Sequence, residues 1–507
     1  MIKREIIKLI SQKTGLKEDK IKVTRTENAD FGDFTTNIAM QLKKPAQEIA
    51  DKLKSNLFEK IAVAGPGFIN FFVAPAVLQK QVGTILKEKD KFGQLKIGKG
   101  RKINVEFISA NPTGPLTLGN GRGGFCGDVL ANVLEKADYK ITREYYINDT
   151  GEQIKQLGHS VLNDSEAVYK GSYIEDLKKE IKDTDPEKAG KEAAAVILKI
   201  IKKSVVEVMK INFDVWFSEK SLYQKKEVDR AMDILKKKKL TYEKDGALWF
   251  KTIDFGDDKD RVLVKADGEK TYLASDIAYL QDKIRRGFDK IIVFLGADHY
   301  GYVARIKAAA VALGYKKEDF EIIIMQLVRL FDGQNEVRMS KRTGTYITIE
   351  ELINEVGLDA ARFFFLSRAS DSHLTFDLNL AKKQSNENPV YYVQYAHARI
   401  CSILAKAKMI EVGPQSSLLV HPAELSLINQ LTRLPEVIED VAKDYQIQRL
   451  PQYAMDLATA FHQFYHECQV IADDKKLTSA RLSLVMATKI VLKNTLSLMG
   501  ISAPEKM

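Results

Sequence analysis

The sequence predicts an α/β fold in which a doubly wound parallel sheet is preceded by a small α+β domain and followed by an all-helical domain. Three observations support this prediction. An apolar strand expected at 103–108 leads into a glycine-rich turn and a helix, and a second strand–turn–helix unit extends from Ile291 to Gly314. Both strands are apolar without strict alternation, as is typical of parallel strands buried on both faces. Helical periodicity then dominates from about residue 385 onwards.

The composition is that of a globular protein with a basic surface. The 507 residues are enough for about three or four domains. A net charge of +10 favours a polyanionic partner, although a lysine-rich proteome would give the same value. The three cysteines are far apart in sequence and suit a reducing compartment. Neither a secretory signal nor an apolar run of about 20 residues is visible, so we expect a cytoplasmic protein without membrane partners.

The domain boundaries follow from changes in pattern along the chain. We expect a small α+β domain at 1–90, a doubly wound domain at 97–350 with a lysine-rich helical insertion at about 152–210, a connecting segment at 351–384 and a helical domain at 385–507. In the first domain, 31–44 is helix-like and 65–73 is strand-like. Between the insertion and Ile291, residues 246–255 are hairpin-like, and the run Lys236 to Lys239 is more typical of a solvated helix end than of a binding patch.

The glycine-rich turn predicts a nucleotide site. Glycines let backbone N–H groups approach a phosphate, and the N-terminus of the following helix adds partial positive charge. Turns of this kind occur in many folds and with many ligands, so the turn alone is not specific. The residues that we expect to contact the nucleotide here are Pro115, Thr117, Gly119, Asn120 and Arg122.

A second segment makes the nucleotide site specific. Residues 338–344 read Arg-Met-Ser-Lys-Arg-Thr-Gly and form a cationic loop after the apolar run 322–330. Lys341 is the candidate catalytic lysine, with Met339 and Ser340 beside it in contact with the nucleotide. Closure of such a loop would bring positive charge to a reacting phosphate. The simpler alternative for Lys341 is an ordinary surface lysine.

Together, the glycine-rich turn and the distant Met-Ser-Lys loop resemble the ATP site of class I aminoacyl-tRNA synthetases. Six blocks, in family order, are similar to bacterial-type arginyl-tRNA synthetases: VEFISANPTGPLTLGNGRGG, YYINDTGEQI, FDVWFSEKSLY, GALWFKTIDFGDDKDRVL, TYLASDIAYL and NPVYYVQYAHARI. The segment Asp359-Ala360-Ala361-Arg362 is a variant of the Asp-Ala-Leu-Arg signature of these enzymes. The blocks span the catalytic region and reach into the C-terminal domain.

The resemblance implies a fold, a reaction and its partners. The central domain would be a Rossmann-type catalytic domain, the N-terminal domain would contact the outer corner of a tRNA, and the helical domain would bind the anticodon. The activity implied is that of an arginine–tRNA ligase, in which L-arginine attacks ATP, bound with Mg²⁺, to give arginyl-adenylate. Arginine then passes to the 2′-OH of the terminal adenosine of tRNA(Arg). The family also implies a monomer that needs tRNA for activation.

The first signature of the family departs from its usual pattern. The family usually has His-x-Gly-His at this point, whereas this chain has Thr117-Leu118-Gly119-Asn120. Thr117 and Asn120 can still donate hydrogen bonds, and we assign them catalytic positions together with Lys341, but neither can carry an imidazolium charge. Two alternatives therefore stay open: a tRNA-binding paralogue with lost or reduced catalysis, and a different nucleotide-dependent enzyme on the same sheet.

Arginine needs carboxylates and planar acceptors around it, since a guanidinium has five donors and no acceptor. The resemblance assigns Glu106, Asn111, Tyr272 and Asp276 to the arginine site, with Tyr272 and Asp276 at the guanidinium end. Asp298 and His299 follow the strand that begins at Ile291, at the edge where doubly wound sheets bind ligands. They are similar to an element that other class I enzymes use near ribose, and His299 is equally compatible with an arginine contact.

The helical domain offers candidates for tRNA binding. Tyr395 and Arg399 lie in the block NPVYYVQYAHARI, and unpaired bases are recognised by stacking and by hydrogen bonds to their edges. His462, His466 and Cys468 have a spacing compatible with a metal site, but on an amphipathic helix they are expected to pack in the core. The chain has no zinc-type cysteine pairs, so neither zinc nor another resident metal is expected.

Overall fold

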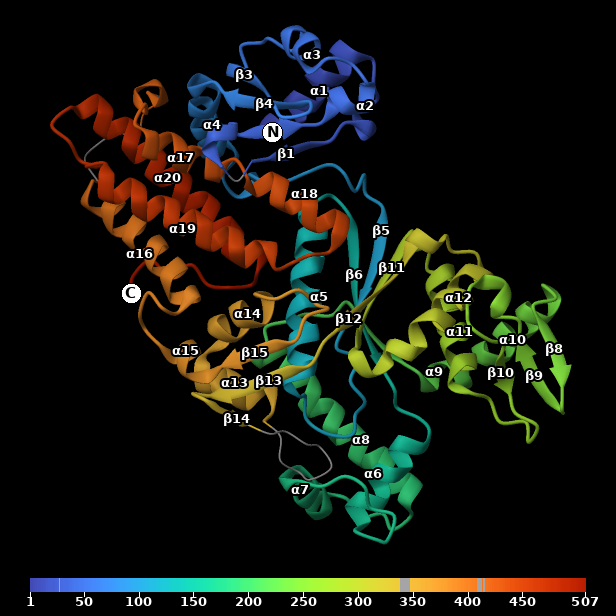
Figure 1. The fold of residues 1–507 in the computed structure, drawn as a ribbon. Coiled ribbons are helices and arrows are strands. Elements are labelled where there is room, and N and C mark those ends of the chain that lie inside the picture. The colour runs from blue at the N-terminus through green and yellow to red at the C-terminus, as the bar shows by residue number, and fades with distance from the viewer. Residues whose placement is uncertain (27, 338–346, 408–412, 414) are drawn as a thin grey trace.

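The computed structural model describes residues 1–26, 28–337, 347–407, 413 and 415–507, and a five-stranded parallel sheet lies at its centre (Figure 1). The strand order is β12-β11-β5-β6-β7, so the chain runs outwards from β5, returns to β11 beside β5 and runs outwards again. This is the predicted doubly wound topology, and ligands of such sheets bind where the direction reverses. The strands are β5 (Lys102–Glu106), β6 (Lys140–Ile147), β7 (Val215–Ser218), β11 (Lys290–Gly296) and β12 (Phe320–Met325).

Helices cover both faces of this sheet. Neighbouring residues of a strand point to opposite faces, and in β11 Ile292 belongs to a large core while Ile291 belongs to a smaller one. The large core includes helix α5 (Leu118–Lys136), and the smaller core includes α11 (Tyr272–Arg285) and α12 (Val303–Leu313). The β5–β11 junction is therefore enclosed from both sides, as the apolar strands predict.

Strand β5 ends at Glu106, two residues earlier than the predicted strand 103–108. The reason is the backbone conformation of Ile108 and Ser109, whose φ angles are 65° and 40°. These values lie in the left-handed region, which a β-branched residue such as Ile108 rarely adopts, so the chain leaves the sheet under strain. The apolar character of Phe107 and Ile108 continues the strand pattern and hides this break from sequence inspection.

A helical module lies between β6 and β7, where the sequence predicts a lysine-rich helical insertion. Helices α6 and α8 pack closely because Gly158 and Gly190 lie at their contact. A Cβ atom on Gly158 would lie 1.8 Å from the carbonyl oxygen of Pro186, and one on Gly190 would lie 2.0 Å from that of Ile154. The helices are α6 (Glu152–Leu162), α7 (Ser172–Glu180) and α8 (Pro186–Lys203), and a π-helical turn (Ser204–Val208) follows them.

A second module lies between β7 and α11 and carries a small antiparallel sheet of order β10-β9-β8. The predicted hairpin is present, although its first strand begins before residue 246. The lysine run 236–239 is exposed at the end of α10, as predicted for a solvated helix end. The elements are α9 (Lys220–Gln224), α10 (Glu227–Lys237), β8 (Thr241–Lys244), β9 (Ala247–Phe250) and β10 (Arg261–Val264).

The N-terminal module combines a four-stranded antiparallel sheet, of order β1-β2-β4-β3, with four helices. The strand predicted within 65–73 is confirmed as β4. The prediction of a helix over 31–44 is wrong for residues 34–36, which pair with β1 and β4 as strand β2. The elements are α1 (Ile2–Thr14), β1 (Val23–Arg25), β2 (Phe34–Thr36), α2 (Ile38–Leu42), α3 (Ala46–Lys52), β3 (Phe58–Ala64), β4 (Phe68–Val73) and α4 (Pro75–Glu88).

The C-terminal part is helical, as its periodicity predicts, and a small sheet of order β14-β13-β15 connects it to the central sheet. The connecting elements are β13 (Val328–Asp332), β14 (Asn335–Val337), α13 (Ile349–Val356), α14 (Leu358–Leu366), β15 (Leu374–Asp377) and α15 (Leu378–Lys382). The helices that follow are α16 (Pro389–Lys406), α17 (Pro422–Leu431), α18 (Leu434–Asp444), α19 (Arg449–Glu467) and α20 (Lys475–Leu498).

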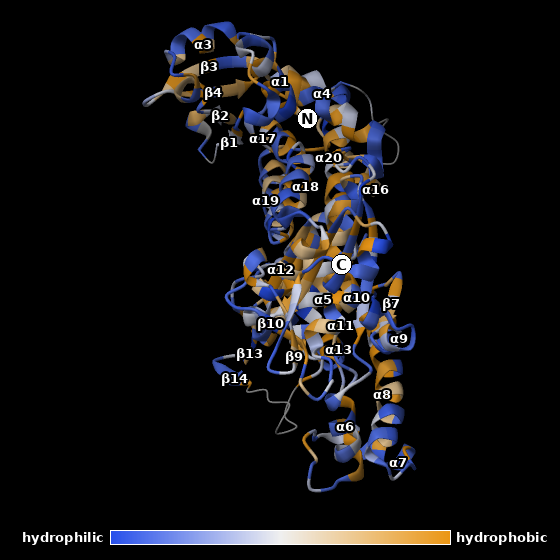
Figure 2. Ribbon diagram, turned by 90° about the vertical axis from the view of Figure 1, so that its right-hand side faces the viewer, coloured by the Kyte–Doolittle hydropathy of each residue, from blue (hydrophilic) through white to orange (hydrophobic). Residues whose placement is uncertain are grey.

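The molecule is elongated, with the N-terminal module at one end and α6–α8 at the other (Figure 2). The N-terminal module is attached to the C-terminal helices through Arg25. Its guanidinium pairs with Glu436 at 2.9 Å and donates to Asn429 at 2.5 Å and to Thr432 at 3.0 Å. Within the described residues, every helix is too short or too polar to cross a membrane.

Arg362 joins three parts of the chain at one buried point. It is 1% exposed, and its Nη1 donates to Asp128 of α5 at 2.8 Å and to the carbonyl oxygen of Met499 at 3.1 Å. Its Nη2 donates to the carbonyl oxygen of Met209, just after the π-helical turn, at 2.9 Å. The arginine of the Asp-Ala-Ala-Arg segment therefore connects helix α5, the end of the helical insertion and the segment after α20.

Arg362→Met is expected to destabilise the protein strongly, because the substitution removes the closest cationic partner of the buried Asp128. Breaking a buried ion pair by removing one partner costs about 3–5 kcal/mol. A thermal-unfolding scan would therefore show a markedly lower Tm. Arg368→Met, at an exposed position nearby, serves as the control and should leave the Tm unchanged. An unchanged Tm for Arg362→Met would contradict this role.

Candidate active site

A cavity of about 850 Å³ opens at the carboxyl ends of β5, β11 and β12, where the winding of the sheet reverses. We call it the turn cavity, because the glycine-rich turn forms one of its walls. This is the position at which a doubly wound sheet binds a nucleotide. The lining residues are Ile108, Thr117, Leu118, Gly119, Asn120, Gly123, residues 294–298, residues 325–329, Glu336, Val337 and Ile347.

Thr117 and Asn120, which replace the two signature histidines, bond to each other. The Thr117 hydroxyl donates to Oδ1 of Asn120 at 2.8 Å, and the Thr117 backbone N–H donates to the same atom at 3.0 Å. The pair forms a capping box at the start of α5, and both residues line the turn cavity. Their side chains thus order the helix N-terminus, whose backbone N–H groups face a potential anion.

Three of the described residues predicted to contact ATP do not line the turn cavity: Pro115, Arg122 and His299. Arg122 is fully buried, and its guanidinium donates to the carbonyl oxygens of Gln326 and Ala369, both at 2.8 Å. Burial lowers the pKa of Arg122. The guanidinium of Arg122 therefore binds backbone carbonyl oxygens inside the protein, and this position does not support the predicted contact with ATP. Pro115 is half-buried in the loop before the turn. Met339, Ser340 and Lys341 lie outside the described residues.

Asp298 and His299 lie on a short 3₁₀ helix (Ala297–Tyr302) rather than at the start of the α-helix predicted there. The side chain of Asp298 is 83% exposed and that of His299 is 54% exposed, and the nearest atoms of the two groups are 3.7 Å apart. Asp298 lines the turn cavity. Both residues are therefore accessible to a ligand at the β11 edge.

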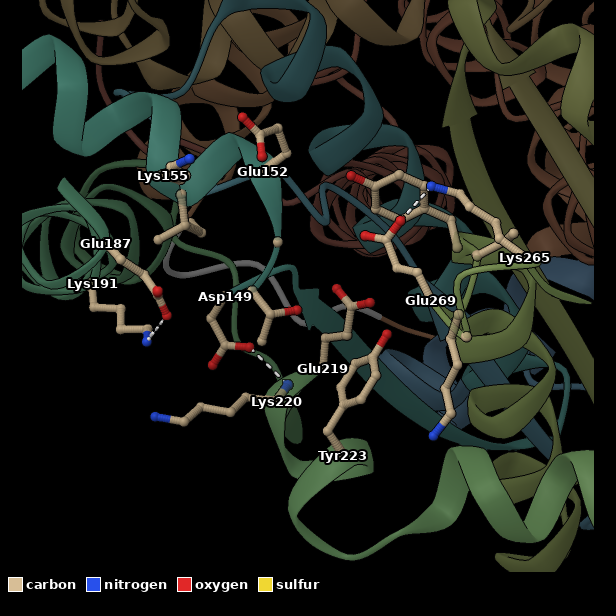
Figure 3. Close-up of a pocket in the computed structure, with 17 residues that line it drawn as sticks. Asp149, Glu152, Lys155, Glu187, Lys191, Glu219, Lys220, Tyr223, Lys265 and Glu269 are labelled. Carbon is tan, nitrogen blue, oxygen red and sulfur yellow. Dashed lines mark hydrogen bonds and ion pairs between the residues drawn. The ribbon is translucent and has the colours of Figure 1, made fainter. Parts of the chain in front are cut away.

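A second cavity, of about 1010 Å³, lies between the helical insertion and the start of α11 (Figure 3). We call it the insertion cavity. Tyr272, predicted for the guanidinium end of arginine, lines it and is 60% exposed. Several of its charged groups pair with each other, as Glu187 does with Lys191 and Glu269 with Lys265. The remaining lining residues are 149–152, Ile154, Lys155, Glu219, Lys220, Tyr223, Gly268, Lys270 and Thr271.

Glu219 is the buried carboxylate of the insertion cavity, and the sequence reasoning missed it. The residue is 3% exposed. Burial is the main cause that raises its pKa to about 7, and the charges of Asp276 and Asp149 add to this effect. A hydrogen bond with Ser275 opposes the rise. The available signal in the sequence was an acidic residue directly after the half-buried strand β7, within the block FDVWFSEKSLY.

Asp276 lies one helical turn after Tyr272 on α11 and is half-buried. It accepts a hydrogen bond from the hydroxyl of Tyr302. Burial raises the pKa of Asp276 to about 6, and the charge of Glu106 adds to this rise, while Tyr302 and Arg305 oppose it. Asp276 and Glu219 are thus two neighbouring carboxylates whose ionised forms are both disfavoured in this site.

The other two residues predicted to bind arginine have partners within the protein. Glu106 is buried, and its Oε2 accepts from Lys283 at 2.5 Å and from Tyr279 at 3.1 Å. The amide of Asn111 donates to Gln153 of α6 at 2.5 Å, which connects the loop after β5 to the helical insertion. The predicted arginine-binding residues therefore come from β5, its following loop and α11.

The helical domain carries a set of aromatic rings around the two residues predicted to bind tRNA. The rings of Tyr391 and Tyr395 stack 6.3 Å apart, and the ring of His462 stacks 6.0 Å from Tyr395. The guanidinium of Arg399 lies 5.0 Å from the ring of Tyr465. We call these four rings the aromatic strip, and such rings can stack on unpaired bases.

The predicted packing of the histidine and cysteine cluster near Cys468 is confirmed in part. His462 packs among aromatic rings in the strip, and burial lowers its pKa. Cys468 is buried, whereas His466 is exposed.

Comparison with known proteins gives matches in the same order as these parts of the structure. Three family models match successive segments: the arginyl tRNA synthetase N terminal domain over residues 1–73, the catalytic domain of class I (R) tRNA synthetases over 81–382, and the DALR anticodon binding domain over 393–507.

Full-length relatives agree with these matches. Arginine–tRNA ligase 1 of Halalkalibacterium halodurans is 44% identical, over 99% of this chain and 98% of its own. The arginine–tRNA ligase of Moorella thermoacetica is 46% identical, over 94% and 92%. The structure of the arginyl-tRNA synthetase of Thermus thermophilus aligns with a TM-score of 0.81 over the whole of both chains at 22% identity, and so supports the fold.

Glu219→Gln is expected to stabilise the free protein at pH 8 and not at pH 5. Because folding raises the pKa of Glu219, the folded state is favoured while this carboxyl group is protonated. This contribution to the free energy of unfolding is full below the unfolded pKa of about 4.5 and is lost as the pH rises through about 7. Since a pKa difference of one unit corresponds to about 1.4 kcal/mol, removing the charge should gain about 3 kcal/mol at pH 8.

Thermal unfolding at both pH values measures this effect. Glu243→Gln, at an exposed position of β8, is the control and should change the Tm at neither pH. An equal change of Tm for Glu219→Gln at pH 5 and pH 8 would contradict the ionisation of a buried carboxyl group as the cause.

Proposed function

The chain belongs to the arginyl-tRNA synthetase family and is an arginine–tRNA ligase, and we propose how its side chains divide the reaction. In this reaction, arginine and ATP form arginyl-adenylate, and arginine then passes to the 3′-terminal adenosine of tRNA(Arg). The observation that carries the function is the ordered match of all three parts of the chain to this one family, with full-length relatives at 44–46% identity.

We propose that Glu219 and Asp276 bind the guanidinium of arginine, with Tyr272 beside them. Burial and mutual repulsion disfavour the two ionised carboxylates in the free protein, since burial raises the pKa of each. A bound guanidinium supplies the missing positive charge, and its five donors suit two carboxylates in charge-assisted hydrogen bonds. Glu106 and Asn111, near the loop that leads to the turn cavity, would then bind the α-amino end.

ATP, bound with Mg²⁺, would occupy the turn cavity. The N-terminus of α5, ordered by Thr117 and Asn120, would face the phosphates, and Asp298 or His299 would lie near the ribose. The reaction needs no general base, because the carboxylate of arginine is already ionised at pH 7. Alignment and positive charge at the α-phosphate are needed instead, and we assign the charge to Lys341, with Met339 and Ser340 beside it.

The remaining properties of the enzyme concern tRNA and assembly. We propose that the aromatic strip and Arg399 bind unpaired anticodon bases, because stacked rings beside a cation suit such bases. We further propose that the enzyme acts in the cytoplasm as a monomer. Activation of arginine in the absence of tRNA is expected to be slow, and pyrophosphate exchange measured with and without tRNA tests this requirement.

The direct test of the function is aminoacylation of total tRNA with labelled L-arginine, ATP and Mg²⁺. We expect charging with arginine and none with lysine or glutamate, because two carboxylates in a confined site select a planar guanidinium. Charging with arginine alone would also show that Thr117 and Asn120 support catalysis. If the protein binds tRNA but charges no amino acid, it is a non-catalytic tRNA-binding relative.

Asp276→Ala is expected to raise the KM for arginine by at least about tenfold, because the substitution removes a charged hydrogen bond that contributes about 1.5–3 kcal/mol. The KM for ATP should stay close to its wild-type value. Asp233→Ala, at an exposed position of α10, is a matched control for loss of an aspartate. A wild-type KM for arginine in Asp276→Ala would remove this residue from the arginine site.

A further inference from the structure

One face of helix α11 connects the arginine site to a buried group of charges. Tyr272, Asp276, Tyr279, Lys283 and Arg286 follow each other at intervals of three and four residues, which places them on one side of the helix. The first two belong to the proposed arginine site. The last three contact the carboxylates of the two strands beside the helix, β5 and β6.

Lys283 is the centre of this buried group. It is 1% exposed, and its Nζ lies 2.5 Å from Oε2 of Glu106 and 3.7 Å from Oε1 of Glu144. The Tyr279 hydroxyl contacts both carboxylates and shares its one proton between them, and Nη2 of Arg286 donates to Glu144 at 2.9 Å. The buried Lys283 and the partly exposed Arg286 thus face the two buried carboxylates, and Arg286 also pairs with Asp282 at 2.9 Å.

The two oxygens of Glu106 have different neighbours. Oε2 receives both Lys283 and Tyr279, whereas Oε1 accepts only the hydroxyl of Ser109, at 3.2 Å. The Ser109 hydroxyl also accepts from the backbone N–H of Tyr146 at 3.1 Å, and Ser109 is one of the two residues with a left-handed backbone after β5. A chain of contacts therefore runs from Lys283 through Glu106 to the strained start of the loop that carries Asn111.

We infer that Lys283 is a positioning residue for arginine activation. By holding Oε2 of Glu106, Lys283 keeps Oε1 in contact with the Ser109 hydroxyl, at the start of the loop that carries Asn111. Lys283 also fixes α11, and with it Asp276, against β5. A displacement of about 1 Å at such a point is enough to misplace a substrate. This inference rests on the proposed arginine site, and it adds a residue that does not itself touch arginine.

The test compares the kinetics of aminoacylation in the wild type and in Lys283→Met, with rates normalised to titrated active sites. We expect the KM for arginine to rise about tenfold or more, while the KM for ATP changes by less than about twofold. Lys236→Met, at an exposed position near the end of α10, is the control for loss of a lysine and should behave as wild type. An unchanged KM for arginine in Lys283→Met overturns the inference.

A second variant separates positioning from charge balance. Lys283→Met/Glu144→Gln removes one buried charge of each sign and leaves Glu106 in place. We expect the double variant, which restores the net charge, to keep the raised KM for arginine, because Glu106 still lacks its lysine. Recovery of both the Tm and the KM would overturn the inference, because it would show that Lys283 only balances charge.

Two further results complete the test. Tyr279→Phe removes one hydrogen-bond partner of Glu106 and no charge, so this variant decides the question if the lysine variants do not fold. We expect its KM for arginine to rise about threefold. A wild-type KM for arginine would overturn the inference. If the wild-type protein itself charges no tRNA with arginine, the proposed function fails. Wild-type activity with normal kinetics in Lys283→Met and Tyr279→Phe is a failure of this inference alone.

Discussion

A carboxylate at the end of a buried strand must be compensated, and the catalytic half of this protein is arranged around that requirement. Glu106 and Glu144 occupy adjacent strands beneath α11, where an unpaired charge would cost several kcal/mol. Burial alone would raise the pKa of Glu144, but Lys283 and Arg286 outweigh this effect and lower the pKa. These pairs and the apolar residues of α11 hold the helix against β5 and β6, and Asp276 lies on the same helix.

The carboxylates of the proposed arginine site show the opposite arrangement. Burial raises the pKa of both Glu219 and Asp276, and no comparable set of cations offsets it among the contacts described for them. The free protein thus carries a local cost, which a guanidinium bound as we propose would relieve. In sites of this kind the empty protein is less stable and the ligand binds more tightly. The raised pKa values of these carboxylates distinguish them from Glu106 and Glu144, which are paired with Lys283 and Arg286.

The sequence predicts the framework of this protein better than its site. The strands at Ile103 and Ile291 and the helices after residue 385 follow from periodicity and turn residues, because those patterns are local. The strand at 34–36 was missed because its pairing partners lie elsewhere in the chain, and strand β5 was predicted too long because Ile108 is apolar while its backbone is left-handed. Local patterns do not contain either fact.

The same limit applies to single residues of the site. Arg122 follows a glycine-rich turn and was therefore predicted to contact ATP, but it is buried against carbonyl oxygens. Glu219 was missed because its pKa is raised mainly by burial, and further by the charges of Asp276 and Asp149, and only the fold creates these surroundings. Lys283 looks like one of many helical lysines until its two carboxylate neighbours are known. The roles of Thr117, Asn120 and Lys341 remain predictions.

The contact between Arg25 and helices α17 and α18 has a consequence for how the protein can be divided. The N-terminal module also packs on the C-terminal helices through α4, and one continuous core contains both Ile2 and Ile501. The two ends of the chain therefore form a single cooperative folding unit, although the catalytic sheet separates them in sequence. A fragment that begins after α4 would expose the sides of α17 and α20 on which α4 packs, so the helical domain is an unsuitable stand-alone fragment for expression.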